Sequence, residues 1–392
     1  MSAKLRYLAP ILGLIAREWG RIGCLGFGGP PAHIALLRRL CVDERKWLTA
    51  EDFEDAVAAC NLLPGPASTQ LAIFCAWRLA GPAGALVGGF CFIAPGLVAV
   101  LGLAVVFLAA HPPRWVLGAG AGAGAAVAAI ALRAGLDLVP ASLARTAAVG
   151  GARRGRWLLY AAVGALAGAS LGAWLVLVLL GCGLIEVVLR GGRRTALALF
   201  PPAPRSLLGV AAGTGGLGAL AWTALKVGAL SYGGGFVIVP LMRADAVHVY
   251  HWMTNAQFLD AVALGQVTPG PVTHTVAVVG YAAHGIGGGL LAALVAFTPS
   301  FAFILLGARR FDRLRHDRRA RAFLDGAGPA AIGAIIGSAV PLALSLSEGW
   351  QVAVLALAAI ALLALRRSVV PTILAAGLVG VVVVLAGAPV PG

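Results

Sequence analysis

Charged residues are scarce in this sequence, and acidic residues are the scarcest. Only 11% of the 392 residues are charged, with 15 Asp and Glu against 30 Lys and Arg, whereas a soluble domain is typically about 25% charged. This composition excludes an ordinary soluble domain. The net charge of +15 does not indicate nucleic-acid binding, because Lys and Arg cluster between apolar runs, as charge in cytoplasmic loops does.

The sequence also lacks the motifs that a metal site, a cofactor or a catalytic centre requires. Its six cysteines show no paired metal-binding spacing, and all but Cys41 lie in apolar segments, which is typical of buried thiols. Residues 213–218 fit the dinucleotide-binding fingerprint, but they open an apolar helix instead of following a strand. No nucleophile with a neighbouring base is evident. We therefore predict no metal, no cofactor and no catalytic residues, so we do not expect an enzyme.

Long apolar runs are what the sequence has in abundance. Hydrophobic residues make up 60% of the chain, and a helix needs roughly 20 mainly apolar residues to cross a bilayer. We expect an all-α, polytopic helical membrane protein with roughly ten to twelve spans, multi-pass in the plasma (inner) membrane. The run 157–185 is long enough for one span or two short ones. The clearest other runs are 83–110, 207–225, 290–307 and 368–389.

Part of the first half of the sequence recurs in the second half without a gap. Residues 21–70 match residues 226–275 at a constant offset of 205, with 17 identities in 50 positions. The matches gather at helix breakers and polar residues, including a Pro-Gly-Pro triplet in each copy. Such a duplication in an apolar chain is typical of a transporter built from two structural repeats. We predict an N-terminal repeat over 1–200 and a C-terminal repeat over 201–392.

Loop charge differs between the two repeats in a way that indicates opposite orientations. The loop 111–114 contains one Arg, whereas its counterpart 309–321 contains seven. Conversely, four positive residues shortly precede Trp47, and the matching stretch keeps only Arg243. Because positive charge marks the cytoplasmic side, we predict inverted repeats with an odd number of crossings between equivalent points. A parallel repeat whose loop composition has drifted is the alternative.

Each repeat contains the same signal for a short helix that stops inside the membrane. Thr49 and Thr254 are each followed three residues later by an acid or an amide, which is the pattern of a capping box at a helix start. We expect each helix to run for about three turns, to Asn61 or Gln266. Pro-Gly-Pro then ends it, because Pro lacks a backbone donor and Gly permits unusual dihedral angles. The second Pro suits the first position of a new helix.

The paired breaks predict an anion site at membrane depth. Irregular backbone is tolerated there only where it faces protein or a water-filled cavity, and the restarted helices point free N–H groups and positive dipole ends at that cavity. Two Gly-rich turns, at 27–30 and 232–235, are expected near the same place. The alternative is that these residues only kink packed helices. The residues predicted to bind the anion are Gly28, Gly29, Pro30, Asn61, Pro64, Gly65, Pro66 and Gln70 in the first repeat, and Lys226, Gly233, Gly234, Gly235, Gln266, Thr268, Pro269, Gly270, Pro271 and Thr275 in the second.

Four charged residues at equivalent positions complete this prediction. Lys226 lies between apolar stretches, and a cation inside the membrane is costly enough to indicate a function. Snorkelling to an interface is the alternative, and it is favoured for its mate Arg21, which lies near Glu18. Asp55 and Asp260 are also mates. These two acids either stabilise helix starts through the dipole or couple transport to protons.

Several motifs beyond the Pro-Gly-Pro triplets point to one family. The first repeat carries Phe-Gly-Gly-Pro with His33, then Arg-Lys-Trp-Leu, and Asn-Leu-Leu-Pro-Gly-Pro with Gln70. The second carries Lys226, a Gly-Gly-Gly turn, Gly-Gln-Val-Thr-Pro-Gly-Pro and Pro-Ser-Phe at 299–301. Together they resemble the chromate ion transporter family in its long, two-domain form, over nearly the full chain. The resemblance adds His33 to the expected anion-binding residues, whereas His274 departs from the family pattern of a small or hydroxylic residue.

The resemblance implies export of chromate, with sulfate as a structural mimic. The residues themselves support a tetrahedral oxyanion, held by backbone N–H groups, amides and hydroxyls, with Lys226 as the counter-charge and one repeat rocking against the other. A sulfate or other anion transporter is the alternative within transport, and a membrane enzyme or scaffold is the alternative from another class. We expect the anion and the lipid bilayer as partners, and no nucleic acid. The sequence leaves the oligomeric state open, a homodimer included.

Overall fold

The chain folds into α-helices. The computed structural model describes residues 3–61, 63, 65–147, 151–191, 216–231, 236–308 and 317–391, and no strand occurs in these segments. The predicted all-α class is therefore confirmed. The helices of the first half are α1 (Ala3–Leu25), α2 (Pro30–Arg38), η1 (Arg39–Glu44), α3 (Ala50–Cys60), α4 (Ala67–Phe107), α5 (Arg114–Ala125), α6 (Val127–Ala147), α7 (Gly151–Ser170), η2 (Gly172–Trp174) and α8 (Leu175–Gly191). Those of the second half are α11 (Leu217–Leu230), α12 (Ile238–Arg243), η4 (Ala244–Val249), α13 (Asn255–Val267), η5 (Val272–His274), α14 (Thr275–Gly307), α16 (Arg318–Ala343), α17 (Gly349–Ala359), η7 (Ile360–Ala364) and α18 (Val369–Leu385).

Several of these helices are suited to a membrane. Four stretches of the described chain are long and apolar enough to cross one: α4, the α5–α6 pair over Arg114–Ala144, Val272–Gly307, and α16. Helices α11, α17 with η7, and α18 are shorter and apolar. The chain is thus a multi-pass helical membrane protein. The run 157–185 forms two helices, α7 and α8, with the short turn η2 between them, and the run 207–225 lies partly outside the described residues.

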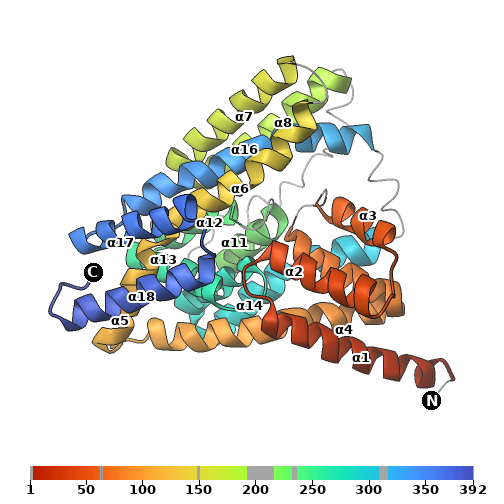
Figure 1. The fold of residues 1–392 in the computed structure, drawn as a ribbon, viewed down its shortest axis with the longest axis horizontal. Helices are drawn as coiled ribbons and strands as arrows, with labels where there is room; N and C mark the ends of the chain where they lie inside the picture. Colours follow the sequence, from red (N-terminus) through yellow and green to blue (C-terminus); the bar gives the residue numbers. More distant parts are fainter. Residues whose placement is uncertain are drawn as a thin grey trace.

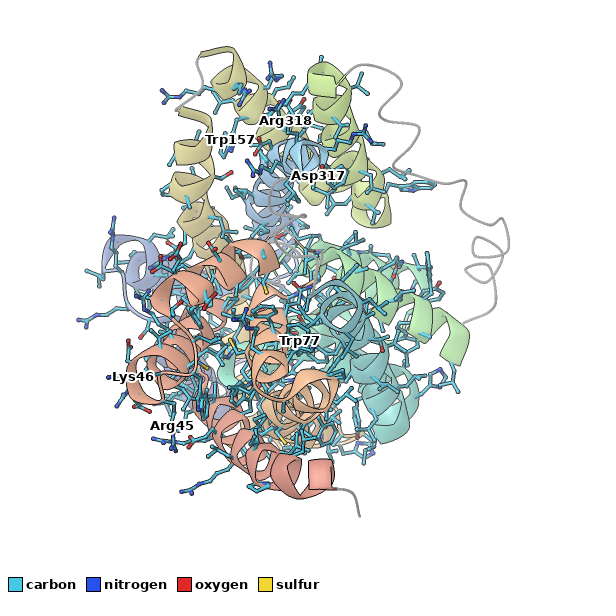
Figure 2. The ribbon with its side chains drawn as sticks, turned by 90° about the vertical axis from the view of Figure 1, so that its right-hand side faces the viewer. Arg45, Lys46, Trp77, Trp157, Asp317 and Arg318 are labelled. Atoms are coloured by element: carbon cyan, nitrogen blue, oxygen red, sulfur yellow. The ribbon has the colours of Figure 1, made fainter. Side chains whose placement is uncertain are left out.

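Helices α6, α7, α8 and α16 lie side by side, and α5 and α18 form a pair below them, near α13 (Figure 1). Helix α16 packs against α6, α7 and α8, and α18 packs against α5. We call α5–α8 and α16–α18 the scaffold group. The helices that carry the repeated motifs, α1–α4 and α11–α14 with η1, η4 and η5, form the motif group. Figure 2 shows Arg45, Lys46 and Trp77 in the motif group, away from Trp157, Asp317 and Arg318 in the scaffold group.

Glycines allow the closest helix contacts in both groups. A Cβ atom on Gly118 or Gly122 of α5 would collide with the backbone of α18 around Gly380, so these small residues let the two helices approach closely. In the motif group, a Cβ on Gly23 of α1 would meet Phe92 O, and one on Gly228 of α11 would meet Ala296 O. The α1–α4 and α11–α14 pairs are therefore packed in the same way.

The duplication reaches the level of single backbone angles. The π-helical turn η1 and its counterpart η4 span equivalent residues at the offset of 205. Lys46 and His251, also equivalent, have φ angles of 52° and 53° in the left-handed region. Beyond Thr275, equivalent positions differ by 204 residues. The kinks in α4 and α14 show this, since they lie at Gly81 (φ 60°) and Gly285 (φ 62°). The predicted two-repeat organisation is thus visible in the described backbone.

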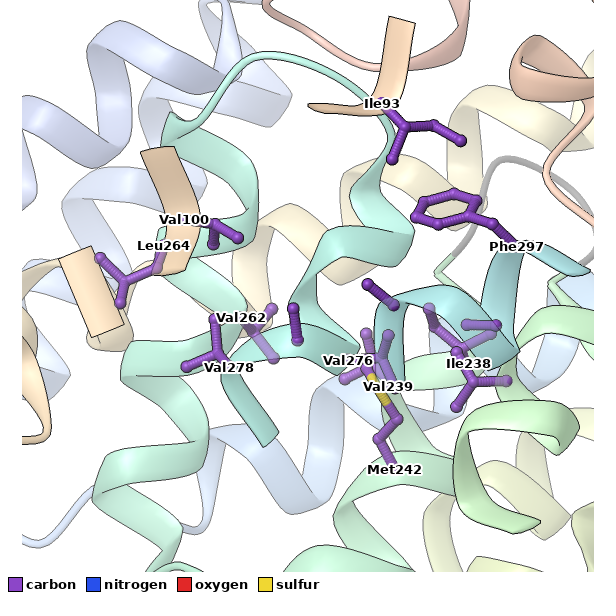
Figure 3. Close-up of a cluster of buried hydrophobic side chains, with 14 of the residues drawn as sticks. Ile93, Val100, Ile238, Val239, Met242, Val262, Leu264, Val276, Val278 and Phe297 are labelled. Atoms are coloured by element: carbon purple, nitrogen blue, oxygen red, sulfur yellow. The ribbon is translucent and has the colours of Figure 1, made fainter. Parts of the chain in front are cut away.

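The long equivalent helices α4 and α14 are antiparallel where they pack. A Cβ on Gly89 would meet the ring of Phe301, and one on Gly289 would meet Leu101, so residue numbers rise along one helix as they fall along the other. A twofold axis across both helices near the equivalent residues Ile93 and Phe297 therefore relates the repeats. Figure 3 shows these two side chains in one buried cluster. Since both helices are long enough to span a membrane, this arrangement supports an inverted repeat.

Candidate functional site

Both short helices before the breaks begin with the predicted caps. The hydroxyl of Thr49 accepts a hydrogen bond from Asp52 N at 3.1 Å. Thr254 and Gln257 form the full reciprocal box: Gln257 N donates to the Thr254 hydroxyl at 3.2 Å, and Thr254 N donates to Gln257 Oε1 at 2.9 Å. These bonds satisfy amide groups that every helix start leaves without a partner. Helices α3 and α13 accordingly begin where the sequence indicates.

The breaks after α3 and α13 are real interruptions of the helix. Gly65 and Gly270 have φ angles of 116° and 96°, a region in which only Gly is unstrained. Pro66 and Pro271 come immediately before the next helices, as N-caps. The prediction that each would be the first helical residue was one position off, because both have extended ψ angles, near 103° and 136°. The restarted helices continue as α4 and, after the short turn η5, as α14.

Each break packs against the long helix of the other repeat. A Cβ on Gly65 would lie 3.3 Å from both Ser300 Oγ and Gly228 O, and one on Gly270 would lie 3.8 Å from Gly96 Cα. Gly96 and Ser300 are equivalent positions, and each directly follows a Pro inside its helix. The two breaks therefore flank the twofold axis, as a shared binding site requires.

A chain of hydrogen bonds joins the second break to the first restarted helix. Gly270 N donates to Gly26 O at 3.0 Å, and His33 Nε2 lies 2.9 Å from the same oxygen. Because a carbonyl oxygen only accepts, His33 carries its proton on Nε2. Its Nδ1 atom then accepts from the Ser68 hydroxyl, at 3.2 Å. Residues from both repeats are thus held together around His33, which is fully buried.

Several buried polar side chains of the two repeats have atoms that make no hydrogen bond. Thr69 Oγ1, Gln266 Nε2, Ser300 Oγ and both ring nitrogens of His274 have no hydrogen-bond partner among the described residues. The carbonyl groups of Ile93 and Pro269 lie beside the His274 ring, but without the geometry of a hydrogen bond. Buried polar groups are normally paired, and leaving one unpaired costs about 1–3 kcal/mol. We call Thr69, Gln266, His274 and Ser300 the donor cluster, since each can donate to an oxygen-rich ligand.

Two imidazole rings lie at the centre of this region. His33 meets Phe92 edge-on with ring centroids 5.0 Å apart, and His274 meets Phe297 in the same manner at 5.4 Å. Phe297 lies at the twofold axis, and Phe92 is adjacent in sequence to Ile93 on that axis. The two histidines are not equivalent positions, since their mates are Ile238 and Thr69. The centre of the site is therefore asymmetric in chemistry although its backbone is symmetric.

Cavities lie between the motif group and the scaffold group, and the described residues line three of them. One of about 180 Å³ adjoins the first break, where Asn61 and Gly65 face residues of α6 and α16. Another, of about 220 Å³, lies between α13 and α5 and is lined by Asp260 and Gln351. The third, of about 100 Å³, lies between α12 and α16. One water needs only about 10–15 Å³ by this measure, so each can admit water.

Lys226 is paired with an acid that sequence reasoning missed. Its Nζ atom lies 2.5 Å from Asp245 Oδ2, and the Thr223 hydroxyl donates to the same oxygen at 2.8 Å. The ammonium also lies 5.9 Å from the Trp222 ring. A signal for this partner existed, because a lone Asp in an apolar stretch of a membrane protein must find a cation.

The remaining predicted residues fall into four sets. Thr268 and Thr275 donate their hydroxyl groups to carbonyls of their own segment, Leu264 O at 2.9 Å and Val272 O at 2.8 Å. Gln70 is fully buried near Gly65. Those at or beside the turns and breaks are Gly28 (φ 97°), Gly29 (φ 74°), Pro30 at the start of α2, Asn61, Pro66, Pro269 and Pro271. Those outside the described residues are Pro64, Gly233, Gly234 and Gly235.

The acids Asp55 and Asp260 occupy equivalent places on α3 and α13, and both are half-buried. A Cβ on Gly120 of α5 would lie 2.7 Å from Asp260 Oδ1. The Asp260 carboxylate therefore faces the scaffold group at a cavity, rather than the hydrogen-bond chain at the twofold axis.

Comparison with known proteins decides the family. The family model described as chromate transporter matches residues 14–187 and 218–381, one match in each repeat. The chain belongs to the chromate transporter family. It is 32% identical over 378 residues to the chromate transport protein of Cupriavidus metallidurans, covering 92% of this chain and 90% of that protein. It is also 32% identical over 380 residues to the chromate transport protein of Pseudomonas aeruginosa, covering 92% and 89%.

More distant relatives extend the family. A probable chromate transport protein of Synechococcus elongatus is 26% identical over 332 residues, covering 82% of each chain. No solved structure matches the chain significantly. Membership confirms the resemblance that the motifs indicate, and it agrees with a transporter rather than an enzyme.

Proposed function

We propose that this member of the family carries chromate, a tetrahedral oxyanion, through a site between the two breaks. The observation that carries the proposal is the donor cluster, because its four side chains are buried without hydrogen-bond partners among the described residues and come from both repeats, with His274 and Ser300 beside the two breaks. A tetrahedral oxyanion offers acceptor oxygens in several directions, which suits donors that come from both repeats. The predicted turn and break residues would contribute backbone N–H groups to the same ion.

Positive potential at this site has two sources in the proposal. The N-terminal ends of α4 and of η5–α14 start at the breaks and point helix dipoles toward the axis. Lys226 adds a full charge, but Asp245 neutralises it in this structure. For Lys226 to act as the counter-charge, the anion must compete with Asp245 for the ammonium group.

The cavities favour a particular movement. Helices α4 and α14 of the two repeats pack directly on each other, whereas the cavities lie between the motif group and the scaffold group. We therefore propose that these two groups rock against each other, in place of the simpler movement of repeat against repeat. We further propose that transport runs outward across the plasma membrane, and that the repeats divide near residue 200.

Proton coupling through Asp260 is the accompanying proposal. Its carboxylate faces a cavity between the two groups, so protonation would change the charge at the surface that moves. Asp55 is the equivalent candidate in the first repeat.

The function is tested with purified protein in liposomes. We expect labelled chromate to enter vesicles that contain the protein, faster with a proton gradient than without one, and unlabelled sulfate to compete. Sulfate uptake without chromate uptake would make this a sulfate transporter. Uptake of neither anion would contradict the proposal.

A further inference from the structure

Arg243, at the end of α12, is a half-buried cation without an acidic partner among the described residues. Its Nε and Nη2 atoms donate to Asn255 Oδ1 at 3.1 and 2.7 Å, and Nη2 also donates to Ser345 Oγ at 2.8 Å. These acceptors are neutral, and they use three of the five guanidinium N–H groups. The two N–H groups of Nη1 have no acceptor in the described part of the chain. A half-buried cation without a paired anion is costly, so a bound anion would stabilise it.

The equivalent residue of the first repeat shows that this situation is not imposed by the fold. Arg38 occupies the same position on α2 and pairs with Glu54 at 2.9 Å. The mate of Glu54 is Leu259, so the second repeat has lost the acid and kept the arginine. Asp245, two residues after Arg243, is not the missing acidic partner, because its carboxylate is bonded to Lys226 and Thr223.

Arg243 lines the cavity of about 100 Å³ between the motif group and the scaffold group. Exposed His248 of η4 lines it too, with Ser170 next to η2 and Ser338 of α16 on the scaffold side. The described residues that line this cavity include no Asp or Glu. The Ser170 and Ser338 hydroxyl groups donate to Leu166 O and Ile335 O, so Arg243 and His248 are the donors that this pocket offers. A pocket with a permanent cation, an imidazole and no such acid has the chemistry of an oxyanion site.

The cavity lies further out along the motif group than the central site. Ile238, the mate of His33, begins α12, and Arg243 ends it. At 1.5 Å per residue, Arg243 lies about 8 Å along the helix from Ile238. In an inverted repeat, Arg243 is on the face opposite Arg38, which is the external face by the charge distribution.

We propose that this cavity is a second oxyanion site, an outer vestibule that receives the transported ion after the central site releases it. The inference rests on the proposed function, because it takes chromate or sulfate as the occupant. The phosphate of an anionic lipid has the same chemistry, so the test must separate the two. A vestibule of this kind concentrates the anion locally and speeds its passage.

Binding of labelled sulfate to the purified full-length protein tests the proposal. In nanodiscs of phosphatidylcholine, we expect two equivalents per chain for the wild type and one for Arg243→Gln. Arg38→Gln is the matched control and should keep two. His248→Glu should also lose one equivalent, and since His248 is exposed, this variant does not depend on the Arg243 hydrogen bonds for its fold.

The outcomes separate the vestibule from the proposed function. A wild type that binds one equivalent keeps the central site and overturns the vestibule, as does an Arg243→Gln protein that binds two. No binding by the wild type overturns both. If phosphatidylglycerol in the nanodisc removes the second equivalent, a lipid phosphate occupies the cavity and the proposal is wrong. In liposomes that take up sulfate through this face, Arg243→Gln should raise KM about tenfold with little change in kcat.

Discussion

The two repeats have the same backbone, but they differ in which of their cations are paired with acids. In the first repeat, two arginines at the ends of the motif helices pair with acids: Arg38 with Glu54, and Arg45 with Glu18. In the second repeat, Arg243 bonds only to neutral groups among the described residues. The buried ion pair of the second repeat has no counterpart in the first. Lys226 binds Asp245, and the residue equivalent to Asp245 is the apolar Leu40.

This contrast separates features that the fold needs from features that a function has shaped. Glycine contacts, π-helical turns, kinks and breaks recur in both repeats, because each repeat must bury the same surfaces. The identity of the polar side chains around the axis does not recur: the mate of His33 is the apolar Ile238, and the mate of His274 is the smaller Thr69. A symmetric backbone thus holds an asymmetric set of donors.

An inverted repeat places equivalent positions on opposite sides of the membrane. Trp115 and Arg319 are equivalent, exposed, and lie near the starts of α5 and α16. We expect Trp115→Cys to react with an impermeant thiol reagent only from outside, and Arg319→Cys only from inside, in a protein without its six native cysteines. Labelling of both from the same side would show that the repeats are parallel.

The next largest effect concerns the buried pair. Lys226→Gln leaves Asp245 buried without a cation, which costs about 3–5 kcal/mol, so we expect a marked loss of thermal stability. The double variant Lys226→Met with Asp245→Leu, which copies the apolar Leu40 of the first repeat, should recover stability but not chromate uptake. Full recovery of uptake by the double variant would make Lys226 a structural residue only.

The two histidines should respond differently to the same change. His33 uses both ring nitrogens, so His33→Thr should lower stability by about 1–3 kcal/mol. His274 has no hydrogen-bond partner among the described residues, so His274→Thr should lower stability only by the packing lost against Phe297 and weaken chromate binding about tenfold, the equivalent of one hydrogen bond. Unchanged binding in this variant would remove His274 from the donor cluster.

The smallest effect compares the helix caps. Thr254→Ala breaks a reciprocal box and Thr49→Ala a single bond to Asp52 N, and each should cost about 1 kcal/mol, with the larger loss at Thr254. Hydrogen exchange of the first amides of α13 and α3 measures both. A larger loss at Thr49 would show that its bond to the side chain of Asp52 is the stronger cap.

Local chemistry made part of this structure predictable. The starts of α3 and α13 follow from Thr49 and Thr254, and their ends follow from Pro-Gly-Pro, because capping and helix breaking depend on neighbours in sequence. The offset of 205 predicted the repeat, and the loop arginines predicted the inversion that antiparallel α4 and α14 support.

The contacts at the axis could not be predicted from sequence in the same way. The kinks at Gly81 and Gly285 lie inside apolar runs, where a glycine alone does not reveal a break. The pairing of Lys226 with Asp245 and the position of His274 against Phe297 depend on packing between segments far apart in sequence. Ser300 is brought beside the first break by the packing of that break on α14, which is also a contact between distant segments.

Chromate uptake by liposomes that contain Gly65→Val or Gly270→Val decides whether the anion binds between the breaks. Both glycines have φ angles that disfavour a side chain, and added atoms would press on Gln70 at the first break and on His274 at the second. Gly102→Val of α4 is the control, since nothing lies within 4 Å of a Cβ there. We expect both break variants to insert and to lose uptake by about a hundredfold, and the control to transport normally. Two well-expressed break variants with normal uptake would contradict a binding site between the breaks.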